Sequence, residues 1–348
     1  MTKSAVAGEL FISQHVDLDR IDLQADYDLT FAALSWEKRS SSAISAVQNL
    51  KSGLILLRFA SSDPDIAEKK EAQLQEFKKL SADCKVINLN SSLDFLGNSR
   101  QIQELLRTKA AAKGRPLRIL WDITCFPKAY LLFVLGLCFT RSYVSRMDCI
   151  YAEGEYSLDI SHADLHADAA KKKGIISEGD WTSLQIPYLE AETALPPGRD
   201  LFVTMGGEVG LSLPFLERYE PNRLGLVLIS ESLIQQPDKL PEPERLAISE
   251  ILAEPRIVRC DISLTNVVEL LQQADNFCFS TKEQVVTGVA IGSKPHALGL
   301  GIAALSHPNM EVVCRIPQRY VPLDVEPAGR FATYVIEDRF EPTAYMRF

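Results

Sequence analysis

The chain has 348 residues, of which 46% are apolar and 24% are charged, and its net charge is −9. This is the composition of an ordinary globular protein, and the length predicts about two domains. Because an acidic protein repels phosphate, the charge argues against a bulk DNA or RNA binder. The longest apolar run, 129–139, is shorter than the roughly 20 residues that cross a bilayer, so we expect no contact with a membrane.

The cysteines and the N-terminus predict a cytoplasmic, reduced protein. The seven cysteines are odd in number, scattered and without CxxC spacing, and the first residues lack the apolar core of a signal peptide. The segment HADLHAD (162–168) has histidines four residues apart, as some metal sites do, but it lacks the glutamate of HExxH and lies in a polar connector. We interpret it as a solvated surface, and we expect neither a metal site nor a cofactor.

In the first half, apolar segments alternate with helical patterns. The strands are expected at 28–35, 54–60, 84–90, 118–124 and 147–153. The helices are expected at 43–50, at 64–80 after an Asp63-Pro64 start, from a capping segment at 90–92 to Gly114, and at 129–139. Strands that alternate with helices predict a mostly parallel sheet covered on both faces, a Rossmann-like unit.

The same order returns after a polar stretch that ends in Pro196-Pro197-Gly198, the best candidate for a domain boundary. Strands are expected at 200–206, 223–229, 256–262 and 285–291, with helices ending near 219 and covering 242–253, 263–273 and 295–305. We therefore expect an α/β protein with a Rossmann-like repeat at 1–156, a connector at 157–198 and a second repeat at 199–348.

The two halves also match residue by residue at offsets of about 170, which indicates duplication of one fold. The matching pairs are Glu37 and Glu208, Gly53 and Gly225, Val86 and Val258, Lys128 and Lys294, and Ile150 and Val313. Any two Rossmann-like units share strand and helix spacing, but conserved order at a nearly constant offset favours duplication. A fused pair of this kind resembles a homodimer within one chain.

Ligands of open parallel sheets lie beyond the carboxyl ends of the strands, where helix N-termini expose N–H groups. That rule selects four loops as the candidate binding site. The candidate ligand-binding residues are Ser35, Trp36, Lys38, Arg39, Asp122, Thr124 and Lys128 in the first copy, and Gly206, Gly207, Gly292, Ser293 and Lys294 in the second. Hydroxyls, backbone N–H groups and lysines there can hold phosphate or carboxylate oxygens.

Each candidate also has a structural interpretation. Gly206-Gly207 can be a tight turn, Asp122 can cap the next helix, and Trp36 can be a packing residue rather than a base-stacking one. Lys128 and Lys294 can be solvated, although a cation in the first turn of a helix opposes the helix dipole and thereby favours an anionic ligand.

The segment WDITCFPK after the fourth strand resembles the D-[ILV]-[ST]-G-G-T-[KR] loop of the CARF class, with Asp122, Thr124 and Lys128 at the Asp, Ser/Thr and basic positions. Cys125-Phe126-Pro127 replaces the glycines of that motif, and the second copy has Ile291-Gly292-Ser293-Lys294 without an aspartate. Two fused units are similar to SAVED domains and tandem CARF proteins, and also to uncharacterised bacterial two-Rossmann proteins. The CARF and SAVED resemblance implies binding of cyclic oligonucleotides in anti-phage defence.

These observations predict a sensor that binds an anionic nucleotide in a cleft between the two repeats and acts through a partner protein. An alternative is a hydrolase or transferase acting on a nucleotide or sugar-phosphate, with Glu37 or Glu208 as general base and a lysine as electrophile. A third is a scaffold with a vestigial cleft. Since neither GxSxG nor a Cys–His pair marks a nucleophile, we favour binding over catalysis.

Overall fold

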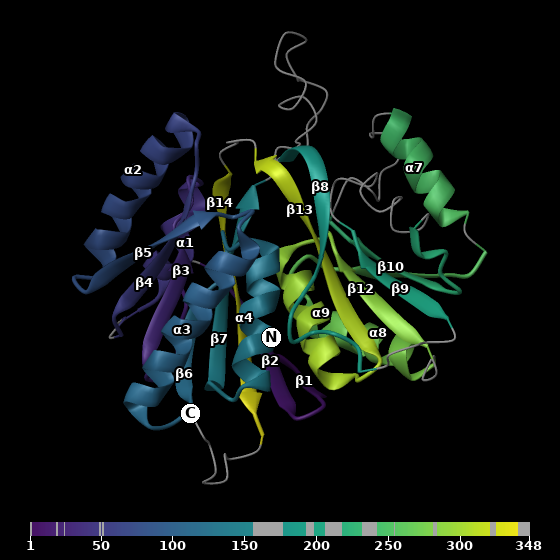
Figure 1. Cartoon of the computed structure of the whole chain (residues 1–348), viewed down its shortest axis with the longest axis horizontal. Coiled ribbons are helices and arrows are strands. Elements are labelled where there is room, and N and C mark those ends of the chain that lie inside the picture. Colours follow the sequence, from purple (N-terminus) through teal and green to yellow (C-terminus); the bar gives the residue numbers. More distant parts are fainter. Residues whose placement is uncertain are drawn as a thin grey trace. The chain divides into compact units, whose positions relative to one another are not determined.

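A computed structural model describes the chain except for residues 1, 19, 24, 49, 51, 156–176, 193–197, 206–217, 232–241, 254, 281–283, 321–324 and 340–348. By its internal contacts the chain divides into two compact units. Each unit is an α/β structure built around its own sheet (Figure 1).

The first unit contains a β-hairpin, five parallel strands with their helices, and one strand from the end of the chain. Its elements are β1 (Lys3–Ala7), β2 (Leu10–Leu18), β3 (Leu29–Ala33), the 3₁₀ helix η1 (Lys38–Ser41), α1 (Ser42–Ala46), β4 (Leu54–Ala60), α2 (Pro64–Leu80), β5 (Cys84–Ser91), α3 (Phe95–Lys113), β6 (Leu117–Asp122), α4 (Lys128–Thr140), β7 (Val144–Glu155) and β14 (Glu326–Asp338).

The second unit holds most of the remaining elements in the described part of the chain. They are β8 (Ser177–Gln185), β9 (Arg199–Thr204), β10 (Leu224–Ile229), α7 (Glu242–Leu252), β11 (Ile257–Ile262), α8 (Val267–Phe279), β12 (Val285–Ala290), α9 (Lys294–Ser306) and β13 (Met310–Tyr320). The first two residues of β8 and the last three residues of β13 group with the first unit instead.

Both sheets are mostly parallel. The first has the order β1-β2-β14-β7-β6-β3-β4-β5, in which β5, β4, β3, β6 and β7 are parallel and β1, β2 and β14 pair antiparallel. The second has the order β11-β10-β9-β12-β13-β8, in which β11, β10, β9, β12 and β13 are parallel. The expected α/β fold with two mostly parallel sheets, consistent with two Rossmann-like halves, is confirmed.

Two strands lie outside the halves in which the sequence pattern put them. The C-terminal β14 pairs between β2 and β7 in the first sheet, although it lies within 199–348. Strand β8 belongs to the second sheet, although it lies within the connector 157–198. The pattern of apolar residues marks a strand but carries no information on its neighbour, because pairing at a sheet edge is set by tertiary contacts.

Side chains of the first sheet alternate between two cores, as the period of two in a strand requires. Ala32, Leu54, Leu56 and Leu120 pack with Leu74 and Phe77 of α2 and with residues of α1 on one face. On the other face, Phe31 and Trp121 contact Phe126, and Phe59 contacts Tyr130 of α4. Figure 1 shows α3 and α4 together on this second face.

The second sheet is covered in the same way. Ile248 and Ile251 of α7 join the core cluster of Leu201, Leu226 and Val289 on one face. Phe202 of β9 contacts Phe277 of α8 on the other, where α8 and α9 pack together. The helices α4 and α9, which begin with the matched Lys128 and Lys294, both have 13 residues and are both apolar around most of their circumference.

Each unit has one place where the strand order reverses. In the first unit the chain passes from β3 outward to β4 and β5, and then returns to β6 on the other side of β3. In the second unit it passes from β9 to β10 and β11, and then returns to β12 on the other side of β9. Such a topological switch point opens a crevice at the carboxyl ends of the two central strands, because their loops lead in opposite directions.

Candidate functional site

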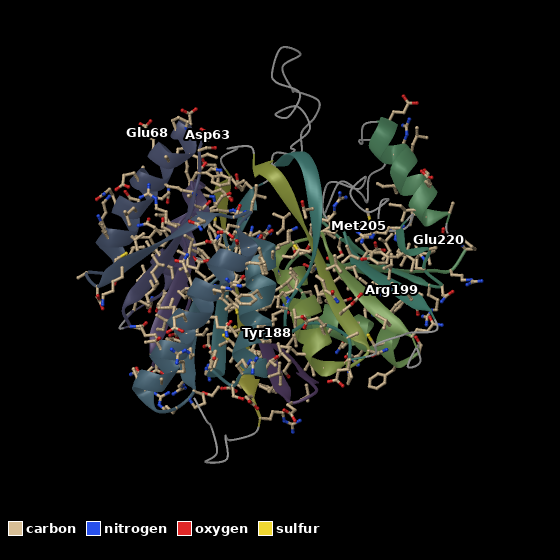
Figure 2. The ribbon with its side chains drawn as sticks, viewed as in Figure 1. Asp63, Glu68, Tyr188, Arg199, Met205 and Glu220 are labelled. Carbon is tan, nitrogen blue, oxygen red and sulfur yellow. The ribbon has the colours of Figure 1, made fainter. Side chains whose placement is uncertain are left out.

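All four loops selected from the sequence belong to the switch points. The loops after β3 and β6 flank the switch point of the first unit, and the loops after β9 and β12 flank that of the second. Figure 2 shows Arg199 and Met205 at opposite ends of β9, with Met205 at the carboxyl end that leads into the switch point. The expectation of a single cleft shared by the two halves stays a prediction.

The loop after β6 is held in place by Asp122 and Thr124. The Asp122 carboxylate accepts the backbone N–H of Thr124 at 2.8 Å, and the Thr124 hydroxyl accepts the backbone N–H of Ala152 at 2.9 Å. Both side chains are buried, and Thr124 is fully inaccessible. Their main role in this structure is therefore to fix the turn and to tie it to β7. The role of Asp122 is structural, but it is not the expected helix cap, because α4 begins after Pro127 and has no side-chain cap.

The loop after β3 is tied to the same part of β7. The Ser40 hydroxyl accepts the N–H of Ser35 at 3.2 Å, which closes the turn. Arg39 is buried, donates to the Glu37 carboxylate at 2.7 Å and places its guanidinium 3.5 Å from the Tyr151 hydroxyl of β7. The structure thus brings Arg39 and Thr124 to neighbouring residues at the carboxyl end of β7.

Lys128 is the first residue of α4 and is half-buried. The residue before it, Pro127, provides no side-chain hydrogen bond to cap the helix. Backbone N–H groups in the first turn of a helix bind anions, and a lysine there adds a cationic donor. Of the candidate residues in the first unit, Lys128 therefore has the geometry best suited to an anionic group.

Lys38 differs from Arg39 because its side chain is exposed. It forms an ion pair with Glu326 at the beginning of β14, and both partners are more than half exposed. Exposed pairs of this kind contribute little to stability, so Lys38 can exchange Glu326 for another anion at little cost.

The sequence reasoning missed Lys70 of α2. Its side chain is 5% exposed, and its ammonium donates to the carbonyl oxygen of Phe59 at 2.6 Å. It lies 5.9 Å from the centroid of the half-buried Trp36 ring. The signal was present, since Ile66, Lys70 and Leu74 repeat at four-residue spacing and all three are buried.

Burial lowers the pKa of the Lys70 amine to about 8, and the nearby Arg58 guanidinium lowers it further by repulsion. Arg58 is itself paired with Glu71 at 3.2 Å. A lysine whose pKa is reduced at the carboxyl edge of a parallel sheet is typical of functional sites.

In the second unit, the loop after β12 closely approaches the carboxyl end of β9. The backbone N–H of Gly292 donates to the Thr204 carbonyl oxygen at 2.7 Å. A Cβ at this glycine would lie 3.2 Å from the carbonyl oxygen of Met205 and from the Thr204 Cβ, so a larger residue would push this loop away from the end of β9. Gly206, Gly207 and Glu208 lie outside the described residues.

Ser293 is the N-cap of α9. Its hydroxyl accepts the N–H of His296 at 3.1 Å and donates to the carbonyl oxygen of Leu264 at 3.0 Å. These bonds join the beginning of α9 to the loop before α8, so the hydroxyl has a structural role. Lys294, the first residue of α9, is half-buried like Lys128.

His296, which sequence reasoning did not select, is completely buried at the same helix end. Its Nε2 donates to the carbonyl oxygen of Ser263 at 2.9 Å, since a carbonyl can only accept. Burial lowers the pKa of this imidazole to about 4, so His296 is neutral at pH 7.

Among the residues described, no group of three histidine, cysteine, aspartate or glutamate side chains is arranged to hold a metal ion. The segment 162–168 lies outside them. None of the helices described is both long and apolar enough to span a bilayer. All seven cysteines are free thiols.

Comparisons with known proteins do not assign a family. No protein-family model matches the chain, and no curated protein matches it. A solved structure that covers the adenylation, ketoreductase and pseudo Asub domains of a keto acid-selecting NRPS module is similar over 83% of this chain, with 12% identity and a TM-score of 0.19. The aligned part is 28% of that longer chain.

Proposed function

We propose that the protein is a sensor that binds an anionic nucleotide at the switch-point crevices of its Rossmann-like units and acts through a partner protein. The observation that carries the proposal is the position of the two matched lysines. Lys128 and Lys294 each begin the helix that follows the returning strand at a switch point. This is where open α/β sheets bind their ligands and where helix N-termini receive phosphate.

Two features of the first unit add support for a nucleotide. Trp36 is half-buried in the loop on the other side of the crevice, where an indole can stack on a base. Lys38 and Lys70 provide further positive charge on the same side of the crevice.

The resemblance of WDITCFPK to the CARF loop makes cyclic oligonucleotides the first compounds to test, and suggests that the proposed role belongs to anti-phage defence. The matching offsets and strand orders further support duplication of one unit, and the free thiols are consistent with a cytoplasmic protein.

The hydrolase or transferase alternative is less well supported. It requires Glu37 or Glu208 as general base, and the Glu37 carboxylate is already bonded to the buried Arg39 guanidinium. This ion pair would have to break before the Glu37 carboxylate could approach a substrate or a water molecule as a base.

The test is thermal unfolding of the purified chain with a panel of mononucleotides, cyclic dinucleotides and cyclic oligoadenylates, followed by titration calorimetry and by chromatography for turnover. A ligand at a hundred times its Kd stabilises the folded state by about 2.7 kcal/mol, which is a measurable shift in Tm. We expect one class of nucleotide to raise Tm without being consumed.

The matched variants are Lys128→Met and Lys85→Met. Lys85 is exposed and lies near the amino end of β5. It is therefore at the end of the sheet opposite to the carboxyl ends of the strands, where the proposed ligand binds. Loss of the shift in Lys128→Met but not in Lys85→Met supports the proposed site. Absence of binding to every nucleotide refutes the proposed function, and turnover abolished by Glu37→Gln replaces it with the enzymatic alternative.

A further inference from the structure

A buried ammonium group lies at the carboxyl edge of β4. Lys70 comes from the second turn of α2, and its Nζ bonds to the carbonyl oxygen of Phe59, the next-to-last residue of β4. Figure 2 marks Asp63, the N-cap of α2, from which the helix leads to Lys70. The amine is thus at the edge where the proposed ligand binds.

This ammonium lacks a compensating charge within the described part of the chain. No described carboxylate lies within 4.0 Å of its Nζ, and the Phe59 carbonyl is the one described hydrogen-bond acceptor. Arg58 of β4 repels the ammonium, and Glu71 of α2 itself is paired with Arg58. Glu37, which precedes η1, is paired with Arg39. A buried cation without a counter-charge is costly, and an anion delivered by a ligand would remove much of that cost.

The indole of Trp36 lies beside this amine. The Lys70 Nζ is 5.9 Å from the Trp36 ring centroid, within the range in which a cation is attracted to an aromatic face. Trp36 itself is half-buried, so a residue that contacts the buried amine is partly accessible to solvent. An anionic group that enters along this indole meets two N–H groups of the ammonium for which no protein acceptor is described.

We propose that Lys70 is an anion-binding residue whose ammonium receives a phosphate group at the carboxyl edge of β3 and β4, beside Trp36. The inference rests on the proposed function and deepens it. It adds to Lys128 a second basic residue, Lys70 of α2, which lies on the opposite side of the crevice. A phosphate oxygen would supply both the missing counter-charge and the missing hydrogen-bond acceptor.

A purely structural role makes the opposite prediction. If Lys70 only joins α2 to β4 through the Phe59 carbonyl, its loss destabilises the fold and leaves ligand affinity unchanged. If Lys70 is kept for an anion, replacing its uncompensated charge by an apolar side chain of similar length leaves Tm unchanged or raises it, and lowers affinity.

The experiment measures binding of inorganic pyrophosphate to the full chain at pH 7 by titration calorimetry. The variants are Lys70→Met and the control Lys79→Met, which removes an exposed lysine from the same helix. We expect a Kd about 10- to 100-fold higher for Lys70→Met, as for loss of a charge-assisted hydrogen bond, and no change for Lys79→Met. The ligand-free Tm of Lys70→Met should equal or exceed that of the unmodified chain.

An equal Kd in Lys70→Met, or no binding of pyrophosphate by the unmodified chain, overturns the inference. Its failure is separable from failure of the proposed function. If nucleotide binding persists unchanged in Lys70→Met, this inference is refuted and the proposed function stands. If the unmodified chain binds pyrophosphate but no nucleotide, and Lys70→Met loses the pyrophosphate binding, the proposed function is refuted and this inference stands.

Discussion

The Thr124→Val substitution tests how the crevice of the first unit is held together. Valine has nearly the shape of threonine but lacks the hydroxyl that accepts the backbone N–H of Ala152 at 2.9 Å. Thr124 and Ala152 are both completely buried, so water cannot replace the lost acceptor. An unsatisfied buried N–H costs about 1–3 kcal/mol, and we expect Thr124→Val to lower the free energy of unfolding by about 2 kcal/mol.

Thr124→Ser is the matched control, because serine keeps the hydroxyl and loses one buried methyl group, worth about 0.8 kcal/mol. Urea unfolding followed by circular dichroism measures both variants, and amide hydrogen exchange reports locally on the Ala152 N–H. The expected order of stability is unmodified chain, then Thr124→Ser, then Thr124→Val, with exchange at Ala152 fastest in the valine variant. A Thr124→Val chain as stable as the unmodified one would refute the assignment of Thr124 as the residue that joins the β6 loop to β7.

Two further substitutions give direct tests. Gly154→Ala would place a Cβ 2.4 Å from Val325 Cγ1 and 3.0 Å from the Arg39 guanidinium, so it should lower stability by about 1–3 kcal/mol in thermal unfolding; an unchanged Tm would contradict this packing. His296 has a folded-state pKa of about 4, below its ordinary value of 6.5, so the unfolded chain binds the extra proton and stability should fall by about 3 kcal/mol as pH falls from 6.5 to 4. His296→Gln should remove that part of the pH dependence, and an identical pH profile in the variant would show that this imidazole is not the source.

Strands and helices with a continuous apolar pattern could be predicted closely from the sequence. The segment 54–60 is β4, and the Asp63-Pro64 start is the N-cap and first residue of α2. Local chemistry decides such elements, since apolar runs, caps and prolines act within a few residues. The helix expected at 43–50 is shorter because α1 ends at Ala46, where Val47 instead forms a bridge with Ile21.

Features that depend on distant partners could not be predicted. Strand β14 pairs with β2 and β7, which are far away in sequence, and the expected capping segment at 90–92 is replaced by Asp94, whose side chain accepts the Gly97 N–H. An N-cap can shift by a few residues among several polar candidates, and a strand pattern carries no information on the sheet that it joins.

The same distinction holds for the candidate site. The rule on strand ends found the loops at both switch points, because loop position follows from strand order. It did not separate side chains that hold the loops, such as Thr124 and Ser293, from those that remain suited to a ligand, such as Lys128. It also missed Lys70, whose amine reaches the carboxyl end of β4 from the buried face of a helix.

Amide hydrogen exchange of the full chain, with and without the nucleotide that gives the largest thermal shift, tests the central claim most directly. Binding at the switch point of the first unit predicts slower exchange in peptides that cover 34–41 and 123–130, and unchanged exchange at the opposite edge of the sheet around Cys84 and Lys85. Slower exchange confined to that opposite edge, or no change in either loop at saturating nucleotide, would contradict it.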